Sequence, residues 1–125
     1  MFSTKIQHVK AMGETFPLTM DLNVYAMLQE EYGTLDEWHK RTFGDEEHDP
    51  KIIDLIGTVR AMVNEGIEIE NETGHPYREP ISMTVAGMIC QEVSMAGIKD
   101  IIRGLGEKSK EDQEENVEET SPRTN

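Results

Sequence analysis

Basic residues are scarce in this chain. It has 12 Lys and Arg against 25 Asp and Glu among 125 residues, a formal net charge of −13. Nucleic-acid backbones and anionic membranes would repel it, so the composition argues against both as partners and favours a soluble protein that resists self-association. A mass of 14.2 kDa allows a single domain.

Cysteine and long apolar runs are also lacking. Cys90 is the only cysteine, which excludes an intramolecular disulfide and fits a reducing compartment. No stretch approaches the roughly 18 apolar residues that span a bilayer, and residues 1–13 lack the apolar core of a signal peptide. We therefore expect a cytoplasmic chain without a membrane anchor, with a buried and inert thiol at Cys90.

Large hydrophobic residues are few, and they are distributed unevenly. Leu, Ile, Val and Phe number 27 of 125, close to the level below which a highly charged chain does not fold. Residues 107–125 hold one of them, Val117, and a net charge of −4. The sequence predicts one folded domain over residues 1–106 and a disordered acidic tail over residues 107–125.

The first part of the domain has the pattern of a β-hairpin followed by a helix. Alternating residues on both sides of Gly13 predict two strands within about residues 2–20. Pro17 lacks a backbone donor, so we expect its strand at a sheet edge. Asp21 is a suitable N-cap for a helix over residues 22–32.

Two further helices follow. The segment Thr34–Glu37 has the form of a capping box that starts a short helix. Asp49–Pro50 is a start signal for a helix over residues 50–64, which Gly66 is expected to end, with a long connection over residues 67–80. The apolar face of this helix is expected to contain Ile52, Ile53, Ile56, Val59 and Val63, and its weaker face Lys51, Asp54, Thr58, Ala61 and Glu65.

The last part of the domain is expected to be helical. Ser82 caps a fourth helix, and Gly97 is expected to mark a break before a fifth. The expected apolar stripes are Val85, Met88, Ile89, Val93 and Ala96 on the fourth helix and Ile98, Ile101, Ile102 and Leu105 on the fifth. The predicted fold is mainly α, a small α+β domain with an N-terminal β-hairpin and about five short helices.

No pattern for catalysis, metal binding or cofactor binding is found. The four histidines fall on different expected elements, and Cys90 has no cysteine neighbour. The acidic pairs lie on polar faces and in loops, where their pKa values would stay ordinary. We expect no catalytic residue, no metal and no cofactor, and hence a protein that is not an enzyme.

The apolar surface of these helices is large for the core that about 106 residues in short elements can form. Either all of this surface is core, or part of it forms a groove for a partner helix or a self-association face. The candidate contact residues are Tyr25, Trp38, Phe43, Ile98 and Ile102.

Four short segments can be compared with a known family by their order in the chain: FPLTMDLN from Phe16, LQEEYGTLDEW from Leu28, MVNEGIEIENE from Met62 and ISMTVAGMI from Ile81. Over about residues 5–105 this succession resembles the tail assembly chaperones of long-tailed bacteriophages and prophages of Gram-positive bacteria. The motifs mostly report helix caps and core positions. The resemblance therefore carries over a fold and a role, with no catalytic residues.

The resemblance implies a protein that coats the tape measure protein before the tail tube polymerises and keeps it soluble. It also implies recruitment of tail tube protein subunits, which later displace the chaperone. Such a protein would act in the host bacterial cytoplasm and be absent from the finished virion. Many members of the family also have a longer form extended by ribosomal frameshifting, and self-association into a homo-oligomer is possible.

Two alternatives stay open. The net charge of −13 is compatible with an acidic inhibitor that mimics DNA and occupies the basic cleft of a nucleic-acid enzyme. A minor structural protein of the tail or capsid is the other alternative, and its presence in finished particles would separate it from a chaperone.

Overall fold

The computed structural model describes residues 5–106 of the chain. In this part an N-terminal antiparallel hairpin precedes helices α1 to α4 and a fifth helix that begins at residue 95 and includes residue 106. The prediction of a mainly helical fold with an N-terminal β-hairpin is confirmed. The predicted tail over residues 107–125, and residues 2–4 of the predicted hairpin, lie outside the described residues.

The hairpin consists of β1 (Ile6–Ala11) and β2 (Glu14–Thr19), with Val9 opposite Phe16. Its turn residues, Met12 and Gly13, both have positive φ, at 54° and 75°. Positive φ at both central positions matches the twist of the two strands in a tight hairpin. β2 packs against α3, so one face of the hairpin is closed.

Local capping chemistry sets the start of the first two helices, α1 (Leu22–Tyr32) and α2 (Leu35–Phe43). The Val24 amide donates to the Asp21 carboxylate at 3.0 Å, and the Glu37 amide donates to the Thr34 hydroxyl at 3.0 Å. Each bond satisfies an amide that has no partner within the helix. Both predicted caps are confirmed.

The helix α3 (Ile52–Glu72) is longer than predicted. Its start carries no side-chain cap, so the Asp49–Pro50 signal is two residues early. Gly66 lies buried inside the helix, because Pro17 of β2 approaches it: a Cβ added at Gly66 would lie 2.9 Å from the Pro17 Cβ. The prediction that Gly66 ends the helix was wrong, since this glycine serves close packing.

The buried face of α3 also differs from the predicted one. Asp54 and Thr58 are buried, whereas Ile52 and Ile53 are 61% and 60% exposed. Both buried side chains have partners. The Trp38 indole donates to the Thr58 hydroxyl at 2.9 Å, and that hydroxyl donates to the backbone carbonyl of Asp54 at 2.8 Å. The Asp54 carboxylate accepts a hydrogen bond from the Tyr32 hydroxyl at 2.9 Å. Hydrogen bonding removes most of the cost of burying such groups.

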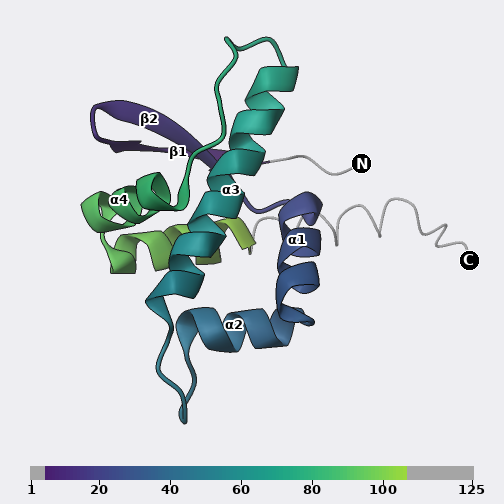
Figure 1. The fold of residues 1–125 in the computed structure, drawn as a ribbon, viewed down its shortest axis with the longest axis vertical. Helices are drawn as coiled ribbons and strands as arrows, with labels where there is room; N and C mark the ends of the chain where they lie inside the picture. Colours follow the sequence, from purple (N-terminus) through teal and green to yellow (C-terminus); the bar gives the residue numbers. More distant parts are fainter. Residues whose placement is uncertain (1–4, 107–125) are drawn as a thin grey trace, which may run out of the picture.

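The connection after α3 is shorter than the predicted residues 67–80 and is fastened along the helix. The Asn71 side chain exchanges two hydrogen bonds with the Arg78 backbone, both at 2.9 Å. The Asn64 side chain does the same with Ile81, at 2.7 and 3.3 Å. Because the two asparagines are seven residues apart, they share one face of α3, and the chain returns along it (Figure 1).

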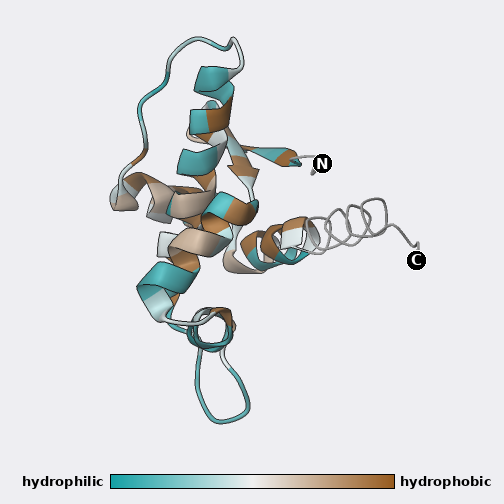
Figure 2. Ribbon diagram, turned by 90° about the vertical axis from the view of Figure 1, so that its right-hand side faces the viewer, coloured by the Kyte–Doolittle hydropathy of each residue, from teal (hydrophilic) through white to brown (hydrophobic). Residues whose placement is uncertain are grey.

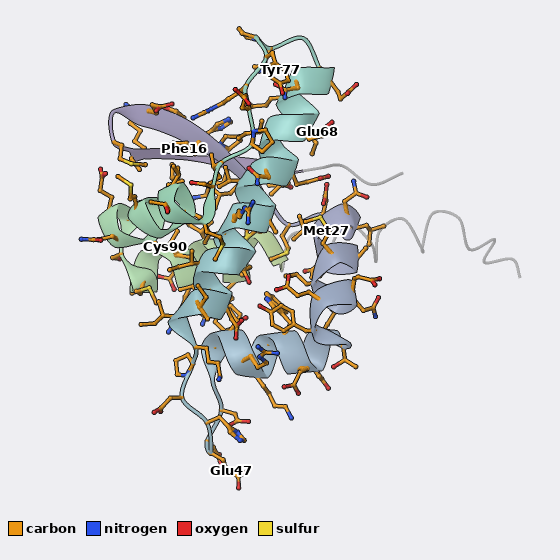
Figure 3. The ribbon with its side chains drawn as sticks, in the orientation of Figure 1. Phe16, Met27, Glu47, Glu68, Tyr77 and Cys90 are labelled. Atoms are coloured by element: carbon orange, nitrogen blue, oxygen red, sulfur yellow. The ribbon has the colours of Figure 1, made fainter. Side chains whose placement is uncertain are left out.

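The helix α4 (Met83–Val93) begins where predicted, because the Val85 amide donates to the Ser82 hydroxyl at 3.2 Å. The predicted stripe is only partly right: Met88 is exposed, and Ala86 and Cys90 are buried beside Ile89. The predicted burial of Cys90 is confirmed, since the residue is 2% exposed; Cys90 is labelled in Figure 3.

The break before the fifth helix lies at Ser94 rather than at Gly97. Ser94 has a φ of 88°, and the helix over residues 95–106 starts directly after it. The Gly97 amide donates to the Ser94 hydroxyl at 3.1 Å, so Ser94 ends α4 and also caps the start of the fifth helix. The predicted apolar set of this helix is confirmed as buried at Ile98, Ile102 and Leu105.

The elements are arranged around α3, which runs along the long axis of the molecule (Figure 1). The hairpin and α4 lie to one side of α3 and α1 to the other, while α2 crosses near the lower end of α3. The loops at the two ends of the long axis are hydrophilic (Figure 2). No helix in the described part of the chain is long and apolar enough to cross a membrane.

Candidate partner-binding surface

Three of the five predicted contact residues are in the core. Trp38 is 7% exposed, and Ile98 and Ile102 are also buried. Tyr25 and Phe43 are partly buried and pack against this core. As the structure stands, the buried three offer little surface to a partner.

Four of the five nevertheless meet at one place, a hollow of about 410 Å³ between α1, α2 and the fifth helix. We call it the aromatic hollow; it is lined by Met20, Tyr25, Trp38, His39, Phe43, Ile102, Arg103 and Gly106. The Trp38 and Phe43 rings meet edge to face, 5.8 Å between centroids, a favourable arrangement for aromatic pairs. Burial raises the pKa of Tyr25, so its phenol stays neutral. Ile98 does not line the hollow.

A second hollow, of about 520 Å³, lies between α1 and α3. We call it the α1–α3 groove; it is lined by Met27, Glu31, Tyr32, Ile53, Asp54, Gly57, Arg60, Ala61, Asn64 and Met83. Its apolar members include two of the most exposed large hydrophobic side chains of the described residues, Met27 at 45% and Ile53 at 60%. The groove therefore combines apolar walls with open access.

The floor of the groove is made of small residues. The nearest atom to a Cβ added at Gly57 is the Met83 Cε at 4.0 Å, so the space above this glycine is free. Ala61 continues the floor one helical turn later. Small floor residues leave room for side chains that enter from outside.

A polar network centred on the buried Asp54 links α1, α2 and α3 at the groove. The Tyr32 hydroxyl donates to the Asp54 carboxylate at 2.9 Å, and the Arg41 guanidinium lies 3.3 Å from the other Asp54 oxygen and over the Tyr32 ring. Burial, followed by the contact with Asp54, raises the pKa of Tyr32 above its usual range. Tyr32 therefore remains a donor, and the network fixes the distance between the walls of the groove.

The sequence did not reveal the groove. Ile53 was predicted on the apolar face of its helix together with Val59 and Val63, and Met27 belongs to a wide apolar arc over residues 22–32. The one available signal was the width of this apolar arc. It indicated that some apolar surface stays outside the core, but not which residues carry it.

A third hollow, of about 520 Å³, is lined mainly by basic side chains, although the chain as a whole is acidic. It is lined by Glu37, Lys40, Arg41, His48, Asp49 and Lys51. Below it the loop before α3 is closed by Asp45, whose carboxylate accepts hydrogen bonds from the Glu47 and His48 amides. The hydrogen bond from the His48 ring, followed by these amides, lowers the pKa of Asp45.

Two more titratable groups have shifted pKa values. Burial raises the pKa of Cys90 to about 11, so the sulfur is a thiol at neutral pH. Burial and the neighbouring Asp21 raise the pKa of Glu65 to about 7, against the opposing hydrogen bond from Asn23. Within residues 5–106 no group of three or more His, Cys, Asp or Glu is placed to hold a metal ion.

Comparison with known proteins gives no relative for this chain. No family model matches it, and neither does any curated protein or solved structure. The function proposed next therefore rests on the surfaces described above and on the resemblance in the sequence.

Proposed function

We propose that this protein is a tail assembly chaperone of a long-tailed phage or prophage. It binds the tape measure protein in the host bacterial cytoplasm, keeps it soluble and helps to recruit tail tube subunits. It leaves the assembly before the virion is finished. A homo-oligomer and a frameshifted longer form belong to the same proposal.

The observation that carries the proposal is exposed apolar surface on a strongly acidic chain. Among residues 5–106, the exposed large hydrophobic residues are Leu22, Met27, Ile52, Ile53, Tyr77 and Met88. Met27 and Ile53 meet in the α1–α3 groove. Exposed hydrophobic residues that gather at one place mark interaction sites, and a groove of this kind accepts the apolar stripe of an amphipathic helix. The charge of −13 would keep such a complex dispersed.

The proposal agrees with the physical needs of a tape measure protein. Such a protein is a long, helix-rich chain with apolar stripes that lie exposed until the tube surrounds it. A small acidic partner that covers the stripes replaces apolar surface by charged surface. No chemical step is needed for this role.

Co-expression tests the proposal. The full chain is produced together with the tape measure protein of the same phage or prophage, and soluble yield and co-purification are measured. We expect the tape measure protein to move into the soluble fraction and to co-purify with this chain. An unrelated aggregation-prone helical protein serves as the control and should stay insoluble. A tape measure protein that stays insoluble, with no complex, would refute the proposal.

A further inference from the structure

We infer that the α1–α3 groove is the site that receives the partner, and that its occupant is an amphipathic helix with an apolar anchor flanked by Lys or Arg. The inference rests on the proposed function and adds the place and the chemistry of recognition. It follows from the shape of the groove, from its apolar side chains and from its charge.

The shape fits a short helix. Along α3 the groove extends from Ile53 to Asn64, a distance of about 16 Å at the helical rise of about 1.5 Å per residue. A partner helix would use about three turns to cover it. The small floor at Gly57 and Ala61 lets the two helix axes approach closely, because interaxial distance depends on the side chains at the contact.

The apolar side chains of the groove are placed to contact one anchor residue of a partner from more than one side. Met27 comes from α1, Ile53 from α3 and Met83 from the start of α4, so the groove is apolar on more than one wall. Methionine is unbranched and polarizable, and it adapts to anchors of different shapes. Two methionines here suit a partner that offers several similar but unequal stripes along its length.

The α1 side of the groove is acidic and faces a cationic side chain of a partner. Glu31 lines the groove, is exposed, and takes part in none of the ion pairs among residues 5–106. Arg60, the one cation in the lining, keeps its charge, but its hydrogen bond to the Ile81 carbonyl at 3.3 Å holds the guanidinium at the connection before α4, away from the α1 wall. The exposed Glu68 lies one turn beyond Asn64 on α3, on the same face; Met27 and Glu68 can be followed in Figure 3.

A second copy of this chain is the less favourable occupant. It would bring another −13 charges to the groove, and like charges across an interface are costly. A helix with Lys or Arg beside its anchor instead meets Glu31 and, further along, Glu68. Charge complementarity therefore points to a different, basic partner.

Two adjacent isoleucines provide a matched pair of variants. Ile52 and Ile53 are almost equally exposed and both lie in the first turn of α3, but only Ile53 lines the groove. Ile53→Ser should weaken binding about tenfold or more, as the loss of an anchor contact does. Ile52→Ser should leave binding within about twofold of the unchanged chain, as surface substitutions usually do.

The binding experiment uses the full chain and overlapping synthetic peptides that cover the tape measure protein of the same phage or prophage, with fluorescence anisotropy as the readout. We expect the peptides that bind to contain an apolar stripe flanked by Lys or Arg. Glu31→Gln should weaken their binding and reduce its dependence on salt, since one charge pair is removed.

The outcomes separate the inference from the proposed function. If no peptide and no full-length tape measure protein binds, the proposed function fails. If peptides bind but the two serine variants behave alike, the function stands and the groove is not its site. If sedimentation shows a dimer of the unchanged chain that Ile53→Ser dissociates and Ile52→Ser does not, the occupant is a second copy and the inference is overturned.

Discussion

The two sides of α3 differ in how they are closed. On one side β2 approaches so closely that only glycine fits at position 66, and Leu55 is fully buried. On the other side Gly57 faces open space and Ile53 is 60% exposed. One side of α3 thus packs into the core, and the other side stays accessible to a partner, although both sides carry apolar residues. Apolar pattern alone does not distinguish packing from binding.

The largest expected difference in stability comes from truncating an aliphatic side chain to alanine on each side of α3. Leu55→Ala should lower the free energy of unfolding by about 2–5 kcal/mol, because it leaves a cavity in the core. Ile53→Ala should lower it by less than about 0.5 kcal/mol, because the side chain is largely solvated. Urea denaturation of both variants measures the difference, and equal losses would mean that Ile53 is packed.

The glycines of α3 should respond in opposite directions. Gly66→Ala should destabilise the fold by about 1–3 kcal/mol, because the new Cβ meets Pro17. Gly57→Ala should stabilise it by about 0.5–1 kcal/mol, because alanine is the better helix former and the space is free. Thermal unfolding of the two variants measures both changes. Stabilisation by both substitutions would contradict the close approach of β2.

The smallest expected effect concerns pH. The pKa of Glu65 is about 7 in the folded chain against an ordinary value of 4.5, so the folded state holds this proton up to higher pH. Its contribution to stability is present in full below about pH 4.5 and is lost as the pH rises through about 7. Relative to Glu65→Gln, the unchanged chain should therefore lose stability between pH 5 and pH 8.

Urea denaturation of the unchanged chain and of Glu65→Gln at both pH values measures this loss. The glutamine variant is the internal control, because it keeps an acceptor for the Asn23 amide and cannot ionise. Parallel pH profiles for the two proteins would show that Glu65 does not hold its proton near neutral pH.

Features encoded by local chemistry were predictable from the sequence. The caps at Asp21, Thr34 and Ser82 each follow from a short side chain that accepts a backbone amide. The hairpin follows from alternation about a turn with Gly13. In each case the residues that decide the structure are neighbours in the chain.

Features encoded by tertiary contacts were not predictable. Gly66 reads as a helix end until β2 is placed beside it, and Asp54 reads as solvated until Tyr32 and Arg41 surround it. The candidate site shows the same limit. The sequence indicated a surplus of apolar surface, but two of the contact residues predicted from it, Trp38 and Ile98, are buried. Which apolar residues remain outside the core is decided by packing, which the sequence pattern does not show.

The most direct test of the account is hydrogen–deuterium exchange of the full chain, alone and in its purified complex with the tape measure protein. We predict that the partner slows exchange in residues 27–32 of α1 and 53–64 of α3, with the hairpin amides unchanged. Slower exchange that is confined to the hairpin would contradict this prediction. So would slower exchange in the residues that line the aromatic hollow while the residues that line the α1–α3 groove are unchanged.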